Sequence, residues 1–70
     1  MSKDTARAAI NRALDTALDD ELLGVSPTEH EISTVELSDL ADEEMERRGL
    51  TFATEWRENG SLVFAPPPTT

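Results

Sequence analysis

The fold is decided between Ile32 and Phe64, a stretch that opens with Ile32-Ser33-Thr34-Val35-Glu36-Leu37. Ser33 followed three residues later by Glu36 has the spacing of a capping box, and Ile32 and Leu37 are placed to form a hydrophobic staple. The pattern predicts a helix that begins at Ser33. Ser38 is an alternative cap that would start the helix four or five residues later.

The same helix is predicted to end at Arg47-Arg48-Gly49, because cations favour the negative end of a helix and glycine commonly follows it. Helical periodicity gives it two faces. The inward face is apolar: Leu37, Leu40, Ala41 and Met45. The outward face is acidic: Glu36, Asp39, Asp42, Glu43 and Glu46.

After Gly49, residues 50–57 and 61–65 read as two short strands around Glu58-Asn59-Gly60. A two-residue Asn59-Gly60 turn would place Leu62 and Phe64 on the face opposite the other large apolar side chains. A three-residue loop with Gly60 in a left-handed bulge instead pairs Trp56 with Leu62 and Thr54 with Phe64. We predict the bulged form, because it puts five bulky side chains on one face: Leu50, Phe52, Trp56, Leu62 and Phe64.

Upstream, a first helix is predicted from a cap at Ser2 or Asp4, with Gly24 just past its end. Its apolar stripe is Ala6, Ala9, Ile10, Ala13, Leu14, Ala17, Leu18 and Leu22. The alanines would allow close approach either of the domain core or of a second copy, so a homodimer through this helix is one expectation.

The connection between the helices carries a second capping signal, in which Ser26 caps, Pro27 takes the first helical position and Glu29 completes the box. The segment has room for only one or two turns, and an extended conformation through His30 to Ile32 is the alternative. The sequence thus predicts an α+β domain over residues 1–65, with two main helices, a short helical turn and a C-terminal two-stranded antiparallel hairpin. Residues 66–70, Pro-Pro-Pro-Thr-Thr, read as a disordered tail.

The net charge is −9, from 15 acidic and 6 basic residues among 70. This field repels nucleic acid and anionic membranes and attracts basic proteins. Only one of the basic residues is lysine, which suits either a salt-rich cytoplasm, as in halophiles, or an ordinary acidic protein of an arginine-using genome. No apolar segment resembles a signal peptide or approaches the length of a membrane span, so a cytoplasmic location is expected.

Catalytic chemistry has few candidate groups in this chain. There is no cysteine or tyrosine, and His30 is the one histidine. Glu29 and Glu31 flank it, but sequence neighbours rarely converge on one metal ion. We therefore predict no enzyme activity, no metal site and no cofactor. Trp56 suits either a partner-binding anchor or a core residue, and we favour the core.

The helix that ends in Arg47-Arg48-Gly49-Leu50, together with the following hairpin, resembles the recognition helix and wing of a winged helix-turn-helix domain over Ser26 to Ala65. That resemblance implies DNA binding, with nucleic-acid contacts from a basic patch of Arg47, Arg48 and Arg57. However, the would-be recognition helix is acidic where bases and phosphates favour basic and amide side chains.

Two functions follow from these patterns. The first is a small non-enzymatic interaction protein, such as a regulatory adaptor, an inhibitor or a viral or phage accessory factor, that docks a basic partner through its acidic helix face. The alternative is a small winged-helix transcription regulator, dimeric through the first helix.

Overall fold

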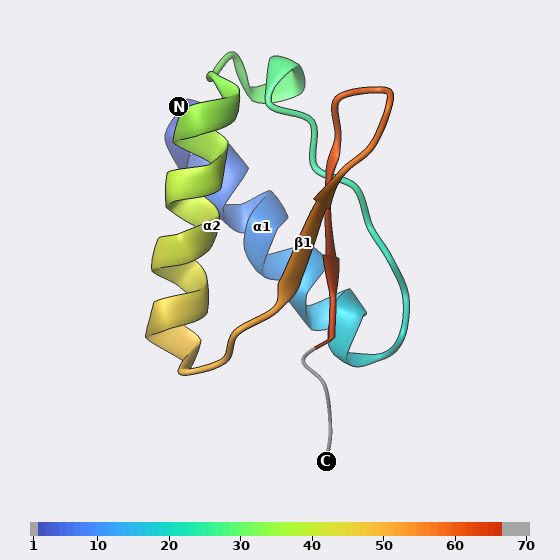
Figure 1. Ribbon diagram of the computed structural model, residues 1–70. Coiled ribbons are helices and arrows are strands. Elements are labelled where there is room, and N and C mark those ends of the chain that lie inside the picture. Colours follow the sequence, from blue (N-terminus) through green and yellow to red (C-terminus); the bar gives the residue numbers. More distant parts are fainter. Residues whose placement is uncertain (1, 67–70) are drawn as a thin grey trace.

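The computed structural model describes residues 2–66, without the side chain of Ser2. Two helices, α1 and α2, pack with a hairpin of two strands, β1 and β2 (Figure 1). The elements in chain order are α1 Ser2–Leu18, the 3₁₀ turn η1 Thr28–His30, α2 Thr34–Arg48, β1 Ala53–Trp56 and β2 Leu62–Ala65. The predicted α+β architecture is confirmed. The predicted tail, from residue 67 onward, lies outside the described residues.

The start and end of α2 follow the local signals. The Ser33 side chain accepts a hydrogen bond from the backbone N–H of Glu36 at 3.1 Å. At the other end Gly49 is left-handed with φ 69°, and its N–H donates to Glu46 and Met45 carbonyls. Ser38 is not the cap.

The hairpin has the predicted register, with Trp56 opposite Leu62 and Thr54 opposite Phe64. The Arg57 N–H donates to the Ser61 carbonyl at 2.8 Å, which closes the three-residue loop. Gly60 has φ 88°, the left-handed conformation that the bulge requires. Burial selects this register because Phe52, Leu62 and Phe64 are all buried.

Three corrections concern the first helix and the connection that follows it. α1 ends at Leu18, with Asp20 left-handed at φ 64°, so Leu22 is not part of the helix. Gly24 serves a different purpose from the predicted one: a Cβ there would lie 3.1 Å from the Ser61 Cβ, so glycine allows the chain to pass close to the hairpin. The capping box at Ser26 does not form, because its hydroxyl contacts Thr28 instead and η1 has no side-chain cap.

The core lies between α1, α2 and β2, and α1 packs against both of the others. The apolar stripe of α1 is largely used inside the chain, with Ala6, Ile10 and Leu14 fully buried. A homodimer through α1 would therefore have to use other residues, such as the half-exposed Leu18. The buried side chains of the core are Ala6, Ile10, Ala13, Leu14, Ala17, Val25, Leu37, Leu40, Ala41, Met45, Phe52, Leu62 and Phe64.

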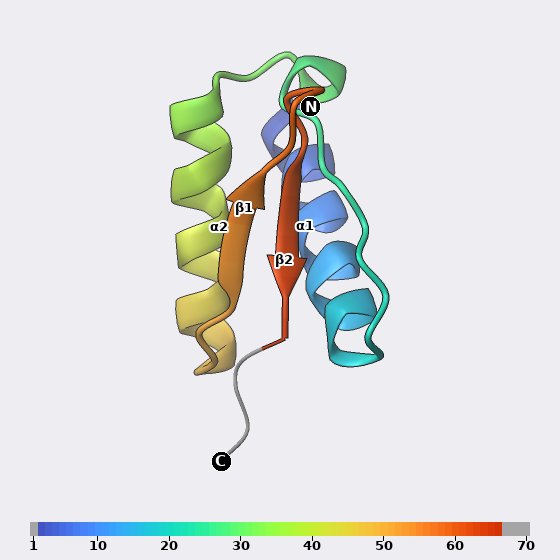
Figure 2. The same ribbon diagram turned by 45° about the vertical axis from the view of Figure 1, so that its right-hand side comes forward.

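The hairpin is placed asymmetrically over the helices. Figure 2 shows β2 on the α1 side and β1 on the α2 side. β2 also pairs with Val25 from the connection before η1, so it is flanked on both sides. Because α1 contacts β2 and not β1, the inner face of β1 has less cover. The prediction that Trp56 and Leu50 join the core is consequently wrong: they are 42% and 38% exposed.

Candidate protein-docking surface

The acidic face consists of Glu36, Asp39, Asp42, Glu43 and Glu46, all on α2. Asp39, Asp42, Glu43 and Glu46 follow the spacing i, i+3, i+4, i+7, which places them on one side of a helix. These four are exposed and, among the described residues, none of them is in an ion pair. Glu36 is half-buried, and its carboxylate lies 3.8 Å from the Lys3 ammonium. The surface is therefore a run of unpaired carboxylates on a rigid element.

Glu44 points the other way and was not foreseen by the sequence pattern. Its side chain is buried between α1 and α2, with only 1% of the residue exposed. Asn11 Nδ2 donates to one carboxylate oxygen at 2.8 Å, and Arg7 Nη1 donates to the other at 3.1 Å. The Arg47 guanidinium lies 3.7 Å from the second oxygen. Glu44 is thus a structural ion-pair residue that holds the two helices together.

The hydrogen bond from Asn11 holds the pKa of Glu44 below its ordinary value of 4.5, and the Arg47 and Arg7 charges act in the same direction. Burial opposes them without reversing the shift. Because the folded state prefers the carboxylate, Glu44 contributes stability above the ordinary pKa and loses it as the pH falls through the lowered one.

Replacing Glu44 with glutamine should therefore lower the free energy of unfolding near neutral pH and make the acid limb of the stability curve shallower. The difference between wild type and Glu44→Gln should be constant from pH 7 to pH 6 and shrink below about pH 4.5. Urea denaturation across this range measures it. A matched Glu43→Gln variant, at an exposed position, should keep the wild-type pH dependence. A constant difference down to pH 3 would contradict the lowered pKa.

The structure does not bring Arg47, Arg48 and Arg57 together. Arg47 faces Glu44, and Arg48 donates to Asp15 at 2.8 Å and to the side chain of Asn11. Arg57 follows β1 at the loop end of the hairpin. α2 and β1 run in opposite directions, so this loop lies near the start of α2 and not near its end (Figure 1). The basic patch expected where the helix end meets the wing is therefore not formed, and nothing in the arrangement favours the duplex-binding alternative.

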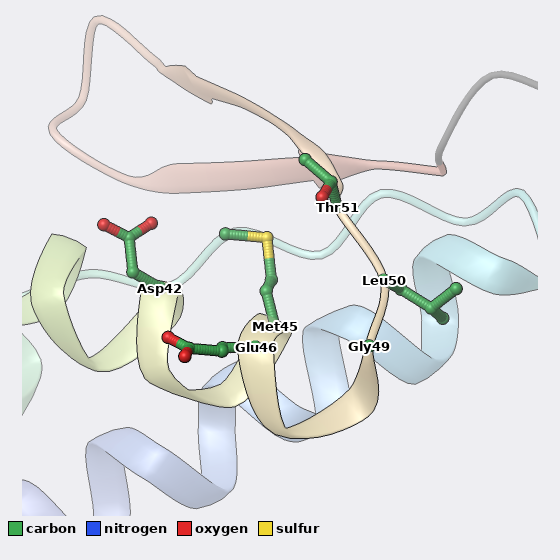
Figure 3. A pocket seen from close by; sticks show the side chains of 6 residues that line it. All are labelled: Asp42, Met45, Glu46, Gly49, Leu50 and Thr51. Carbon is green, nitrogen blue, oxygen red and sulfur yellow. The ribbon is translucent and has the colours of Figure 1, made fainter.

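Two open hollows lie along α2 toward the hairpin, one near each end of the helix, and we call them together the groove. At the start of the helix it is lined by Thr34, Val35, Ser38 and Trp56. Val35 is 68% exposed, so this end offers an open apolar surface beside the indole. At the end of the helix the lining is Asp42, Met45, Glu46, Gly49, Leu50 and Thr51. Figure 3 shows Met45 and Asp42 projecting from the side of α2 that faces the hairpin.

His30, in η1, contacts α1. Its Nδ1 lies 3.2 Å from the Thr5 hydroxyl. Within residues 2–66 no group of three or more histidine or carboxylate side chains is placed to hold a metal ion. In the same part of the chain, neither helix has the length and apolar character needed to cross a bilayer.

No protein-family model, no curated protein and no solved structure matches this chain. In place of the second helix of a helix-turn-helix domain, the described chain has only the three residues of η1.

Proposed function

We propose that this chain is a small non-enzymatic interaction protein that docks a basic surface of a partner protein through its acidic face. The observation that carries the proposal is the row of four exposed carboxylates without ionic partners, Asp39, Asp42, Glu43 and Glu46. Regulatory adaptors, charge-mimicking inhibitors and viral or phage accessory factors all belong to this class.

The proposal is supported by the charge of the chain and by the packing of α2. A net charge of −9 accelerates encounter with a basic partner and repels acidic ones. The carboxylates stand on a helix whose opposite side is fixed in the core by Leu37, Leu40 and Met45. Among the described residues, Arg48 is paired with Asp15, and Arg47 contacts Glu44 and lies beside Glu43 and Glu46 without an ion pair to either, so the row keeps its net negative charge.

Neutralising the face with Asp39→Asn, Asp42→Asn and Glu43→Gln should weaken partner binding about tenfold, because each exposed ion pair contributes about 0.5 kcal/mol. The partner is first captured from native extract, with and without nuclease, and its affinity is then measured from 50 mM to 1 M salt. The variant should also show a shallower salt dependence.

The matched control changes the same number of charges elsewhere, with Asp19→Asn, Asp20→Asn and Glu21→Gln in the exposed turn after α1. This control should bind like the wild type. If both variants lose affinity equally, only the net charge matters and the acidic face is not the docking site. Capture that disappears with nuclease would instead indicate a nucleic-acid-mediated contact.

A further inference from the structure

Among the described residues, β1 has one edge without a neighbouring strand, whereas β2 is bridged to Val25 at Leu62. The backbone N–H and C=O of Leu62 bond to Val25 at 2.8 and 2.9 Å, so β2 is paired on the side away from β1. All four residues of β1 are exposed. Within the described part of the chain, the α2 side of β1 is therefore the sheet edge with the most unpaired backbone groups.

The hydrogen-bond alternation of an antiparallel ladder identifies which groups face that edge. Arg57 bonds to Ser61, and the residues that bond across the hairpin recur at every second position, Glu55 and Ala53. The N–H and C=O of Thr54 and Trp56 consequently point outward. Within the described residues these four groups have no hydrogen-bonding partner.

The free edge of β1 lies on the α2 side of the hairpin (Figure 2), and Trp56 of this strand lines the groove. No Cα atom of α2 lies within 8 Å of a Cα atom of β1. The two elements touch just before β1, where the Phe52 N–H approaches the Met45 sulfur at 3.3 Å. A strand entering beside Thr54 and Trp56 would have backbone partners on one side and the α2 side chains on the other.

The charge of the groove selects the occupant. Asp42 and Glu46 line the groove at the end of α2, and none of the described residues that line either end is basic. A second copy of this chain carries a further −9 and an identical acidic groove, so its approach is opposed. A basic segment is attracted.

We propose that an extended basic segment of a partner protein adds to the free edge of β1 as a further strand and lies in the groove along α2. This inference rests on the proposed function and names the form in which the basic partner is held. The backbone bonds come from Thr54 and Trp56. The apolar surface of Val35 and Trp56 takes an aliphatic side chain, and Asp42 and Glu46 take a lysine or arginine.

The groove also sets the spacing of the recognised residues. Val35 is seven positions from Asp42 and eleven from Glu46, about 10 to 16 Å along a helix. Side chains on one face of a strand recur about every 6.7 Å. An aliphatic residue and a basic residue four positions apart in the partner therefore match the two ends of the groove.

The experiment uses two eight-residue peptides in which every second residue is threonine. In one peptide the other four residues are Val, Val, Lys, Lys from the N-terminus to the C-terminus. In the other peptide their order is reversed. NMR titration of the full chain measures their affinity, and hydrogen exchange measures the exchange rates of the Thr54 and Trp56 amides.

Thr54→Pro removes one outward N–H without removing a bond to β2, whereas Thr54→Ala keeps that N–H. One peptide should bind the wild type and Thr54→Ala alike, bind Thr54→Pro about tenfold more weakly, and slow exchange at both amides. The chemical shifts of Val25 and Phe64 report whether each variant is folded.

Equal binding to Thr54→Pro and Thr54→Ala would overturn strand addition and leave charge-driven docking standing. Strand addition would also be overturned if only the double variant Asp42→Asn, Glu46→Gln lost binding and the peptide protected neither the Thr54 nor the Trp56 amide of the wild type. Protection of these amides without peptide, with the mass of a dimer, would place a second copy at the edge and also overturn the inference. No binding of either peptide to the wild type at millimolar concentration overturns it as well, and the acidic face is tested separately by its own triple variant.

Discussion

Replacing Phe64 with alanine should lower the free energy of unfolding by about 3–5 kcal/mol. Phe64 is fully buried in β2, and it is the largest of the fully buried side chains. Small domains have total stabilities at the low end of about 5–15 kcal/mol, so Phe64→Ala should keep only about 0–2 kcal/mol and be measurably unfolded at 37 °C. Urea and thermal denaturation followed by circular dichroism measure the loss.

The matched control is Trp56→Ala, in the other strand of the same hairpin. Trp56 is 42% exposed, so its replacement should cost less than about 1 kcal/mol of stability. If Trp56→Ala were as destabilising as Phe64→Ala, the indole would have to lie in the core and the apolar end of the groove would not exist. The same variant should weaken partner binding, because it removes the exposed aromatic surface.

Replacing Asn11 with alanine should lower the free energy of unfolding by about 2–3 kcal/mol, because it removes hydrogen bonds to two charged groups. The amide of Asn11 donates to Glu44 at 2.8 Å and accepts from Arg48 at 3.0 Å. Without it, Glu44 keeps its arginine contacts but loses the largest cause of its lowered pKa. Denaturation at pH 7 measures the stability, and NMR titration of the Glu44 carboxyl should show a higher pKa.

The control for Asn11→Ala is Arg12→Ala, the next residue on α1, which is exposed. Alanine favours the helix slightly at both positions, so helix propensity cannot explain a difference between them. Asn11→Ala should be the less stable of the two by at least about 1.5 kcal/mol. Equal stabilities would mean that the hydrogen bonds of Asn11 to Glu44 and Arg48 contribute nothing beyond what water supplies.

The elements that could be predicted from the sequence are those with local causes. The start of α2 depends on Ser33 and Glu36, three residues apart, and its end on Gly49. The hairpin register depends on a loop of three residues and on the alternation of apolar side chains. In each case the interacting groups are neighbours along the chain, so the sequence alone shows them together.

The features that were missed depend on contacts between distant segments. α1 ends four residues before Leu22 because the chain must turn back to reach β2 through Val25. Trp56 and Leu50 have the apolar character of core residues, but no helix packs under β1. Which side of a hairpin a helix covers is set by tertiary packing, which periodicity does not encode.

The candidate docking surface was partly accessible to sequence reasoning. A helical wheel finds the acidic face, because Asp39, Asp42, Glu43 and Glu46 share one side of α2. The wheel also places Glu44 beside Leu37 and Ala41 on the inward side, and this was the available signal for a buried carboxylate. Its partners, Arg7 and Asn11, lie more than thirty positions away and could not be inferred. The groove between α2 and β1 likewise appears only once the elements are placed.

The central position of β2 has a consequence for biosynthesis. Leu62 and Phe64 fill the middle of the core and Leu62 bridges to Val25, yet the ribosome adds both after every other element of the fold. A nascent chain that stops short of Leu62 can form helices, but it leaves the apolar stripe of α1 uncovered on one flank. Native structure can therefore appear only once Leu62–Ala65 has left the exit tunnel. Until then the growing chain exposes apolar surface that chaperones can bind.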